Sequence, residues 1–532
     1  MKSLFKVNGK PFFTIGGQVN NSSNYNEEDI IRSFEIAKRV GINTIAIPFY
    51  WNQIEVEEGK YDTSAVDRVL RLCKENDLRL CIIWFGTYKN GASTYAPEYV
   101  KRNHDKYWPI YTTNGHVSAT LSPVCKETSK RDREAFKHLL LKVKELDKDG
   151  IVIGFQIENE AGCLGPARDY SERGNRQYRE KVPADLIKML ESLKKPCPIL
   201  DYYNESKRKK NGNWEETFGF YAPDIFMAYH LAKYVNNVAE AAKQILPNIP
   251  RYMNCWTYDN GCRVPGISYP SGGPTKNAYE IYKTFCPNID MLTADTYALG
   301  LDEFEAQALP YARKDNQFFI PETYPYIDQY PIIFKMIREH QLTGIHSLGI
   351  DTLLEENGEL KESAVKYKQV VDILNNSKEL LEKYIGTEDF IAVYQMYGEQ
   401  FKVYELGGYI IKVVFFNKND PWIAHVDAKH RGPKATYKTP LGFIFKDKAD
   451  GVFYLTGQGF VARFTKKENV EKTTDSLLYD DAHNKNAFHQ FISIEEGEFA
   501  NNKFTTKRRR NGDEIDYGVW VEDDIGVARI KL

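Results

Sequence analysis

The strongest constraint on the fold is an alternation of short apolar runs with longer amphipathic stretches, from about residue 11 to residue 375. Continuous apolar runs of strand length are typical of parallel strands that are buried on both faces and connected by helices. Runs of this kind occur at 12–17, 44–48, 78–85, 153–160, 251–256, 290–295, 318–322 and 344–349. They predict an α/β fold, a (β/α)8 TIM barrel with long loops. A doubly wound open sheet is the alternative, although no Gly-x-Gly-x-x-Gly motif follows the first run.

The pattern changes after about residue 385. The segments at 408–416, 451–455, 518–521 and 526–532 are typical of short strands between Gly, Asn and Asp turns. They predict a smaller all-β, sandwich-like region. Because 532 residues are too many for one core, we divide the chain into a barrel domain over 1–385 and a β-rich C-terminal domain over 386–532.

The composition excludes several classes of partner. The chain is 42% hydrophobic and 27% charged, with a formal net charge of −2, which is typical of a globular protein without a nucleic-acid partner. The basic run 507–510 precedes Asn511-Gly512, a strong hairpin signal, so we interpret it as part of a solvated hairpin. Residues 1–10 lack the apolar core of a signal peptide, and no run has the length of a membrane span. We therefore expect no membrane partner and a cytoplasmic location.

The cysteines give no metal-binding pattern. All eight lie in the first 290 residues and none forms a Cys-x-x-Cys pair, so we expect reduced, mostly buried thiols rather than structural zinc. Neither a metal nor an organic cofactor is expected.

Two apolar runs end in carboxylates, and these are the sharpest signals of chemistry. The run 153–160 ends in Glu158-Asn159-Glu160, and the run 318–322 ends in Glu322. Burial of an unpaired carboxylate costs several kcal/mol, by rough estimate, so such residues need a reason to be there. Barrel enzymes build their sites at the carboxyl ends of the strands. Glu160 and Glu322 therefore indicate an acid/base pair of the kind that hydrolyses glycosides.

The triplet at 158–160 poses a problem of strand geometry. Side chains alternate along a strand, so Glu158 and Glu160 would face one side and Asn159 the other. The regular pleat must therefore break if Asn159 is to bind a sugar hydroxyl beside Glu160. We assign Glu158 a supporting place, as a partner of the other residues or a ligand for a pair of hydroxyls. A salt-bridged strand end is the structural alternative for the whole triplet.

Several other residues at run ends are candidates for substrate binding. Trp84 and Trp256 could stack on the face of a sugar, with ordinary packing as the alternative. Asp295 and Tyr297 follow the run 290–295, and Tyr297 could donate a hydrogen bond to Glu322. Lys89 and Asn90 could bind hydroxyls or lie in a solvated loop, and His346 and Asp351 are weaker candidates.

Together, these motifs resemble a clan-A glycoside hydrolase of the β-galactosidase-like kind, near families 35 and 42. The barrel-wide pattern covers roughly residues 10 to 370. The family's Asn-Glu matches Asn159-Glu160, and its later strand-end Glu matches Glu322. The stretch 50–62, with Trp51-Asn52, resembles the loop after the family's second strand, and Trp51 is thereby a further candidate for substrate binding. The stretches 84–91 and 269–274 resemble a subgroup with a β-rich C-terminal extension.

The resemblance has two departures. The Trp-x-x-His-Glu-Pro of family 35 is Trp51-Asn52-Gln53-Ile54-Glu55-Val56 here, so the His and the Pro are missing. The cysteine cluster that binds zinc in some members of family 42 has no counterpart in this sequence. The first departure leaves the exact family and the configuration of the sugar at C4 open.

The resemblance implies a retaining exo-acting β-glycosidase, with a β-galactosidase as the preferred specificity. Glu160 would be the general acid/base and Glu322 the nucleophile, and a glycoside or oligosaccharide the substrate. The alternatives are another sugar specificity (glucoside, xyloside or arabinoside), an endo-acting or inverting enzyme, and a non-catalytic carbohydrate-binding barrel. A homo-oligomer is possible, and the natural substrate and the role of the C-terminal domain stay open.

Overall fold

The structure is a computed structural model that describes residues 3–257, 264–416, 438–468, 491–515, 518–522 and 525–532. Cys262 and part of the C-terminal region lie outside the described residues. The seven cysteines within them are free, and most are buried. Among the helices of these segments, none has both the length and the apolar character needed to cross a membrane.

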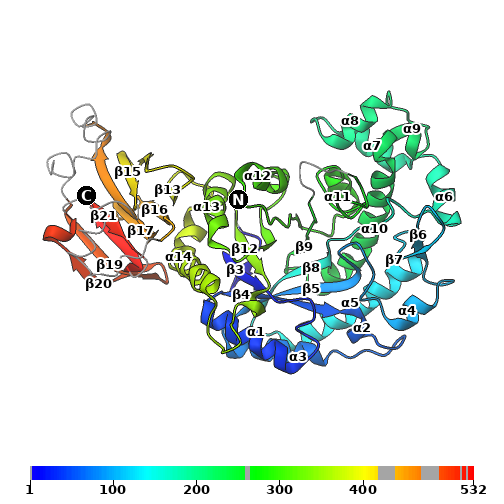
Figure 1. The fold of residues 1–532 in the computed structure, drawn as a ribbon, viewed down its shortest axis with the longest axis horizontal. Coiled ribbons are helices and arrows are strands. Elements are labelled where there is room, and N and C mark those ends of the chain that lie inside the picture. Colours follow the sequence, from blue (N-terminus) through cyan, green and yellow to red (C-terminus); the bar gives the residue numbers. More distant parts are fainter. Residues whose placement is uncertain (1–2, 258–263, 417–437, 469–490, 516–517, 523–524) are drawn as a thin grey trace.

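An eight-stranded parallel sheet forms the centre of the molecule, which confirms the predicted α/β barrel architecture (Figure 1). Its strands are neighbours in chain order, and β10 and β11 form the two edges of the ladder. The strands are β3 (Thr14–Gln18), β4 (Thr44–Tyr50), β5 (Arg79–Lys89), β8 (Val152–Asn159), β9 (Arg251–Met253), β10 (Met291–Leu292), β11 (Ile320–Thr323) and β12 (Gly344–Leu348).

Side chains and loop backbone, rather than strand ladder, connect the two edge strands. The amide of Asn316 donates to Leu292 O at 2.8 Å and its Oδ1 accepts from Leu292 N at 2.9 Å. Thr296 N donates to Glu322 O at 3.2 Å, and the Thr323 hydroxyl donates to Thr296 O at 2.8 Å. The sheet is therefore curled, with a seam between β10 and β11 next to Glu322.

Helices cover the outside of the sheet, as the amphipathic stretches predict. The helices that follow or pack on the strands are α1 (Glu27–Val40), α3 (Ser64–Glu75), α5 (Lys126–Leu146), α10 (Ala222–Ile245), α11 (Tyr279–Phe285), α12 (Leu301–Ala308), α13 (Tyr330–His340) and α14 (Glu362–Tyr384). In α1, Asn26 caps the first turn by accepting from Asp29 N, and Gly41 ends the helix with a left-handed φ of 87°. The buried face of α1 consists of Ile30, Ser33, Phe34, Ile36, Ala37 and Val40.

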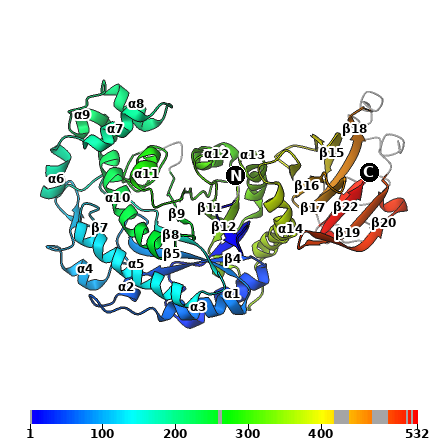
Figure 2. The same cartoon turned by 180° about the vertical axis from the view of Figure 1, so that it is seen from behind.

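The long segment between β8 and β9 forms a group of short helices. These are α6 (Glu172–Arg179), α7 (Ala184–Ser192), α8 (Pro198–Glu205) and α9 (Trp214–Phe218), packed at the end of the molecule remote from the C-terminal strands (Figures 1 and 2). The fully buried Trp214 anchors α9 against Phe226 of α10, with ring centroids 5.2 Å apart. The length of this segment suggests a rim for the site, but its helices α6 to α9 do not line the large cavity described below.

The C-terminal region is a sandwich of two antiparallel sheets. The six-stranded sheet contains β13 (Phe390–Tyr394), β16 (Leu441–Asp447), β17 (Val452–Gln458), β22 (Val527–Lys531), β19 (Ser493–Ala500) and β20 (Lys503–Arg510). The four-stranded sheet contains β14 (Phe401–Leu406), β15 (Tyr409–Phe415), β18 (Phe460–Lys466) and β21 (Val519–Val521). Buried apolar side chains from both sheets, such as Ile411 and Leu455, form the core between them.

The outer face of the six-stranded sheet packs on the barrel helices. Phe443 stacks on Phe334 of α13 with ring centroids 4.6 Å apart, and the hydroxyls of Ser377 in α14 and Thr456 in β17 lie 2.7 Å apart. Phe443 belongs to the same continuous apolar cluster as the barrel core. The division into two domains at residue 385, between α14 and β13, stays a prediction.

The basic run 507–510 lies in β20, but the turn of its hairpin is not the predicted one. Asn501 and Asn502, with φ of 54° and 56°, form the turn between β19 and β20. Two successive left-handed residues match the twist of a hairpin, and asparagine tolerates this conformation. Asn511-Gly512 instead follows β20 and leads into a short helical turn. The four basic side chains of the run form ion pairs with four carboxylates, those of Glu495, Glu496 and Glu498 of β19 and of Glu514.

Candidate active site

A cavity of about 850 Å3 opens at the carboxyl ends of the barrel strands. Its lining includes residues that follow β3, β5, β8, β9, β10 and β11 and the last residue of β12. Among them are these predicted candidates: Glu160, Glu322, Asp295, Tyr297, Trp256, Lys89 and Asn90. The barrel therefore brings together groups that lie far apart in the sequence.

Three carboxyl groups meet in this cavity. One carboxyl oxygen from each of Glu160, Asp295 and Glu322 lies within 4.8 Å of the others. All three side chains are buried, with 7%, 3% and 5% of their surface exposed. In the described part of the chain, these residues form the cluster that is close enough to hold a metal ion. Gln18, Tyr297 and Asn254, however, already donate hydrogen bonds to two of the three carboxyl groups.

The backbone leaves the regular pleat at the end of β8. Glu158 and Glu160 both have left-handed φ values, of 61° and 44°. Such a conformation costs a non-glycine residue about 1–3 kcal/mol and persists only where the surroundings fix it. Here Glu160 N donates to Asn254 Oδ1 at 2.9 Å, and Glu160 O accepts from Gly91 N at 3.3 Å. The break in alternation turns Glu158 away from the cavity while Glu160 enters it.

Glu322 accepts hydrogen bonds on both carboxyl oxygens. Gln18 Nε2 donates to Oε2 at 2.9 Å, and the Tyr297 hydroxyl donates to Oε1. Burial and the neighbouring carboxylates, Glu322 first, raise the pKa of the Tyr297 phenol far above its usual range, so it stays a donor. Two neutral donors hold this carboxylate in a fixed orientation inside the cavity.

Glu160 has a different environment. Burial and the nearby charge of Glu322 raise its pKa to about 7, while Lys89 and Asp295 oppose the shift. A carboxyl group with this pKa carries a proton in a large fraction of molecules at neutral pH. The two glutamates thus face the same space with different neighbours.

Trp84 and Trp51 do not reach the cavity. Both are completely buried: Trp84 Nε1 donates to Asp132 Oδ1 at 2.7 Å, and Trp51 Nε1 donates to Glu55 Oε2 at 3.0 Å. The positions of β5 and α2 along the chain explain why these two side chains lie away from the cavity. Strand β5 continues to Lys89, so Trp84 lies inside the strand, and Trp51 begins the short helix α2 (Trp51–Ile54).

Glu158 and Asn159 are buried next to Glu160 and are not among the residues that line the cavity. Glu158 Oε2 accepts from Tyr88 N at 2.7 Å, and burial together with the adjacent Asp132 carboxyl raises the pKa of Glu158 well above its usual range. Asn159 is completely buried beside Glu160, and neither of its amide atoms has a hydrogen-bond partner among the described residues. An unpaired buried amide costs about 1–3 kcal/mol, so this side chain has free capacity for a ligand.

The structure adds two residues that the sequence reasoning missed. Gln18 is the last residue of β3, and Asn254 directly follows β9. Both are polar residues at the ends of apolar runs, which is the signal that identified Glu160. Gln18 was hidden because the predicted run ended at Gly17, and Asn254 because it lies within the predicted run 251–256.

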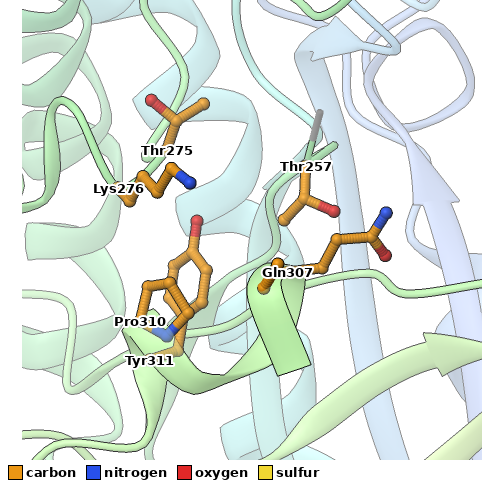
Figure 3. A pocket seen from close by; sticks show the side chains of 7 residues that line it. Thr257, Thr275, Lys276, Gln307, Pro310 and Tyr311 are labelled. Atoms are coloured by element: carbon orange, nitrogen blue, oxygen red, sulfur yellow. The ribbon is translucent and has the colours of Figure 1, made fainter. Parts of the chain in front are cut away.

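A small side pocket of about 10 Å3 shares lining residues with the main cavity, and Figure 3 shows the side chains that surround it. Thr257 and Gln307 line both spaces, and Thr275, Lys276 and Tyr311 enclose the smaller one. The pocket has the size of a single water molecule. Among the described residues the buried Thr275 hydroxyl has no partner, so a water bound here would satisfy it.

Comparison with known families identifies two regions of the chain. The model of the glycoside hydrolase family 42, described as beta-galactosidase, matches residues 21–195. A domain of unknown function, DUF5597, matches residues 367–522. No curated protein matches the chain.

Solved structures share the barrel. The β-galactosidase from Bacillus circulans sp. alkalophilus has a TM-score of 0.50 at 13% identity, over 70% of this chain and 57% of that one. A catalytic mutant of Gan42B, a family 42 β-galactosidase from G. stearothermophilus, has a TM-score of 0.48 at 14% identity, over 71% and 58%. The catalytic domain of the β-amylase from Paenibacillus polymyxa has a TM-score of 0.47 at 14% identity, over 68% and 98%.

The chain thus spans somewhat more than half of the two β-galactosidase chains. At these identities the likeness to the Bacillus circulans enzyme shows the fold, while the family 42 match covers the strands that lead to Glu160. On this match, residues 21–195 are similar to the glycoside hydrolases of family 42, and the barrel has the fold of a β-galactosidase of known structure.

Proposed function

We propose that the protein is a retaining exo-β-glycosidase that releases terminal β-D-galactose, with Glu160 as general acid/base and Glu322 as nucleophile. The observation that carries the proposal is the approach of the Glu160 and Glu322 carboxyl oxygens to within 4.8 Å. Retaining enzymes hold their two carboxyl groups about 5–5.5 Å apart, whereas inverting enzymes leave about 6.5–9.5 Å for a water molecule. The short separation supports direct attack by Glu322.

The surroundings of the two glutamates support this division of roles. In the first step Glu322 attacks the anomeric carbon while Glu160 gives its proton to the leaving oxygen. In the second step Glu160 takes a proton from water, which displaces Glu322 from the sugar. The raised pKa of Glu160, about 7, suits a group that must be protonated first and ionised next. Gln18 and Tyr297 orient Glu322 for attack.

Substrate contacts are proposed for residues at or beside the cavity. Trp256 lines it and offers a flat face for a sugar ring. Tyr297 contacts both Glu322 and the cavity, and the unpaired amide of Asn159 is free to bind a sugar hydroxyl that enters beside Glu160. Trp84, Trp51 and Glu158 are not included, because other groups surround them.

A second candidate keeps the chemistry and changes the sugar: a β-glucosidase, β-xylosidase or α-L-arabinosidase. The observation that favours it is the loop after β4, where the family 35 His and Pro are missing. Glu55 of that loop is completely buried and accepts from Trp51, Gly59 and Tyr99 rather than facing the cavity. This loop therefore contributes no sugar-selecting carboxylate.

A panel of aryl β-glycosides tests the proposal. The wild-type protein should hydrolyse the aryl β-galactoside fastest, and Glu322→Ala should lose at least about 10⁴-fold in kcat. Glu303→Ala, at an exposed residue of the cavity rim, is the matched control. Faster hydrolysis of another sugar would favour the second candidate. Full activity of Glu322→Ala would contradict the whole proposal.

A further inference from the structure

A third carboxyl group, Asp295, lies in the cavity and has no role in the two-glutamate reaction. Its position is fixed: Asp295 N donates to Cys255 O at 3.1 Å, and the Thr257 hydroxyl donates to Asp295 O at 3.0 Å. Its side chain is buried. A buried carboxyl group of this kind must either have a partner that balances its charge or carry a proton.

Asn254 ties Asp295 to Glu160. The Asn254 amide donates to Asp295 Oδ2 at 2.7 Å, and its Oδ1 accepts from Glu160 N at 2.9 Å. The same residue thus holds the backbone of one carboxyl residue and the side chain of the other. The side-chain amide of Asn254 therefore fixes the position of Asp295 relative to Glu160.

The other oxygen of Asp295 meets no donor. Asp295 Oδ1 is buried, and no N–H or hydroxyl of the described residues donates to it. An oxygen of the Asp295 carboxyl instead lies within 4.8 Å of an oxygen of the Glu160 carboxyl. Two carboxylates this close repel each other, so a proton on one of them stabilises the pair. Because Oδ2 already accepts from Asn254, the free Oδ1 is the oxygen that can carry it.

We propose that Asp295 is a positioning residue that stays protonated through the reaction and donates a hydrogen bond from Oδ1 to the Glu160 carboxyl group. The inference rests on the proposed function, in which Glu160 is the acid/base. When Glu160 gives its proton to the leaving oxygen, the carboxylate that remains accepts the Asp295 hydrogen bond. Glu160 later recovers a proton from water, and Asp295 keeps its own throughout.

The surroundings favour a neutral Asp295. Burial, followed by the charges of Glu322 and Glu160, raises the pKa of Asp295 well above its usual range. The other titratable groups that face the pair are Lys89, Tyr297, Tyr252 and Cys255. Burial raises the pKa values of the two phenols and the thiol, so these groups are neutral and Lys89 is the cation. A buried carboxylic acid that acts as a hydrogen-bond donor near neutral pH is a known device of enzymes.

Two substitutions at residue 295 distinguish a protonated Asp295 that donates a hydrogen bond from an ionised Asp295. Asp295→Ala removes the donor, so kcat/KM for an alkyl β-galactoside should fall about 10- to 100-fold, with a smaller loss for an aryl β-galactoside, which needs less help from the acid. The basic limb of the pH profile should move to higher pH, because the Glu160 carboxylate loses a stabilising partner. Asp295→Asn keeps an acceptor for Asn254 and a donor for Glu160. It should therefore retain most of the wild-type kcat/KM, with the basic limb of the pH profile at its wild-type position.

Two results would overturn the proposal. If Asp295→Asn were as impaired as Asp295→Ala, an ionisable carboxylate would be required at this position. If its basic limb moved to lower pH, the substitution would have removed a negative charge, and Asp295 would be ionised in the wild type. Asp302→Asn, on the exposed first turn of α12, is the control for an Asp-to-Asn change near the cavity.

Infrared spectroscopy can test the protonation of Asp295 without any measurement of enzyme activity. The infrared difference spectrum between wild type and Asp295→Asn, recorded at a pH well above the Glu160 pKa of about 7 so that Glu160 is ionised, should contain the carbonyl band of a protonated carboxylic acid, and its absence would contradict the proposal. If the wild type hydrolysed no glycoside in the panel, the proposed function would fail, and this band would still decide the protonation of Asp295.

Discussion

At the scale of single residues, the surroundings give two chemically identical side chains of the site different properties. Glu160 and Glu322 are both buried glutamates, yet Glu322 receives two neutral donors while Glu160 faces carboxyl groups and Lys89. The sequence identifies both acids because each ends an apolar run. It cannot show which donors surround them, because Gln18, Asn254 and Tyr297 come from other strands and approach only in the folded barrel.

The raised pKa of Glu160 predicts how stability depends on pH. A carboxyl group whose pKa rises from 4.5 to about 7 on folding stabilises the fold at low pH, and this contribution is lost as pH rises from 4.5 to about 7. At about pH 8, Glu160→Gln should therefore melt at a higher temperature than wild type and be more stable by on the order of 3 kcal/mol. At about pH 4.5 the two should differ little. Differential scanning calorimetry at both pH values tests this.

Glu303→Gln, at an exposed residue of the cavity rim, is the control for the calorimetry of Glu160→Gln. A wild type that gained stability relative to Glu160→Gln as pH rose would show that the pKa of Glu160 is lowered in the folded protein.

At the scale of elements, the order of strands could be predicted better than the place where each strand ends. All eight strands follow from continuous apolar runs, since that pattern belongs to strands buried on both faces. The ends depend on contacts between distant segments. Strand β5 runs on to Lys89, which leaves Trp84 inside the sheet. At the end of β8 the left-handed Glu160 is held by hydrogen bonds to Asn254 and Gly91. These contacts have no local signal, so the sequence placed Trp84, Trp51 and Glu158 at the site, whereas none of the three lines the cavity.

The ends of helices carry clearer local signals, and α1 offers a test. Gly41 ends α1 with φ of 87°, and its N–H donates to Ala37 O at 2.9 Å. A β-carbon at this position would meet no atom closer than 3.8 Å, so Gly41→Ala should cost about 1 kcal/mol through backbone strain alone. Gly300→Ala, where φ is −85° and the space is open, should change stability by less than about 0.5 kcal/mol. Equal effects in urea unfolding would contradict this account.

At the scale of the whole molecule, the barrel and the C-terminal sandwich share an apolar interface. The sequence predicts both parts from the change in pattern near residue 385. It does not predict that the outer face of the six-stranded sheet, around Phe443, joins the barrel core. This all-β region packs on α13 and α14 at the end of the molecule opposite the helices α6 to α9 (Figure 2).

Truncation of Phe443 should reveal whether the two parts unfold together. The ring is fully buried and stacks on Phe334, so Phe443→Ala should cost about 3–5 kcal/mol. Because the interface is continuous with the barrel core, hydrolytic activity and the β-sheet circular dichroism signal should be lost at the same, lower temperature. Val403→Ala, at a half-exposed residue of β14, should leave both nearly unchanged. Loss of the sheet signal while activity persisted would show that the sandwich does not support the barrel.

The central claim is that Glu322 forms a covalent bond with the sugar. Mass spectrometry of the protein after reaction with a 2-deoxy-2-fluoro-β-galactoside tests it most directly, because the fluorine slows release of the glycosyl-enzyme. The mechanism predicts one added fluorogalactosyl group, located on the peptide that contains Glu322 and absent in Glu322→Gln. A label on another residue, or inactivation of neither protein under conditions where the wild type hydrolyses the unfluorinated substrate, would contradict the claim.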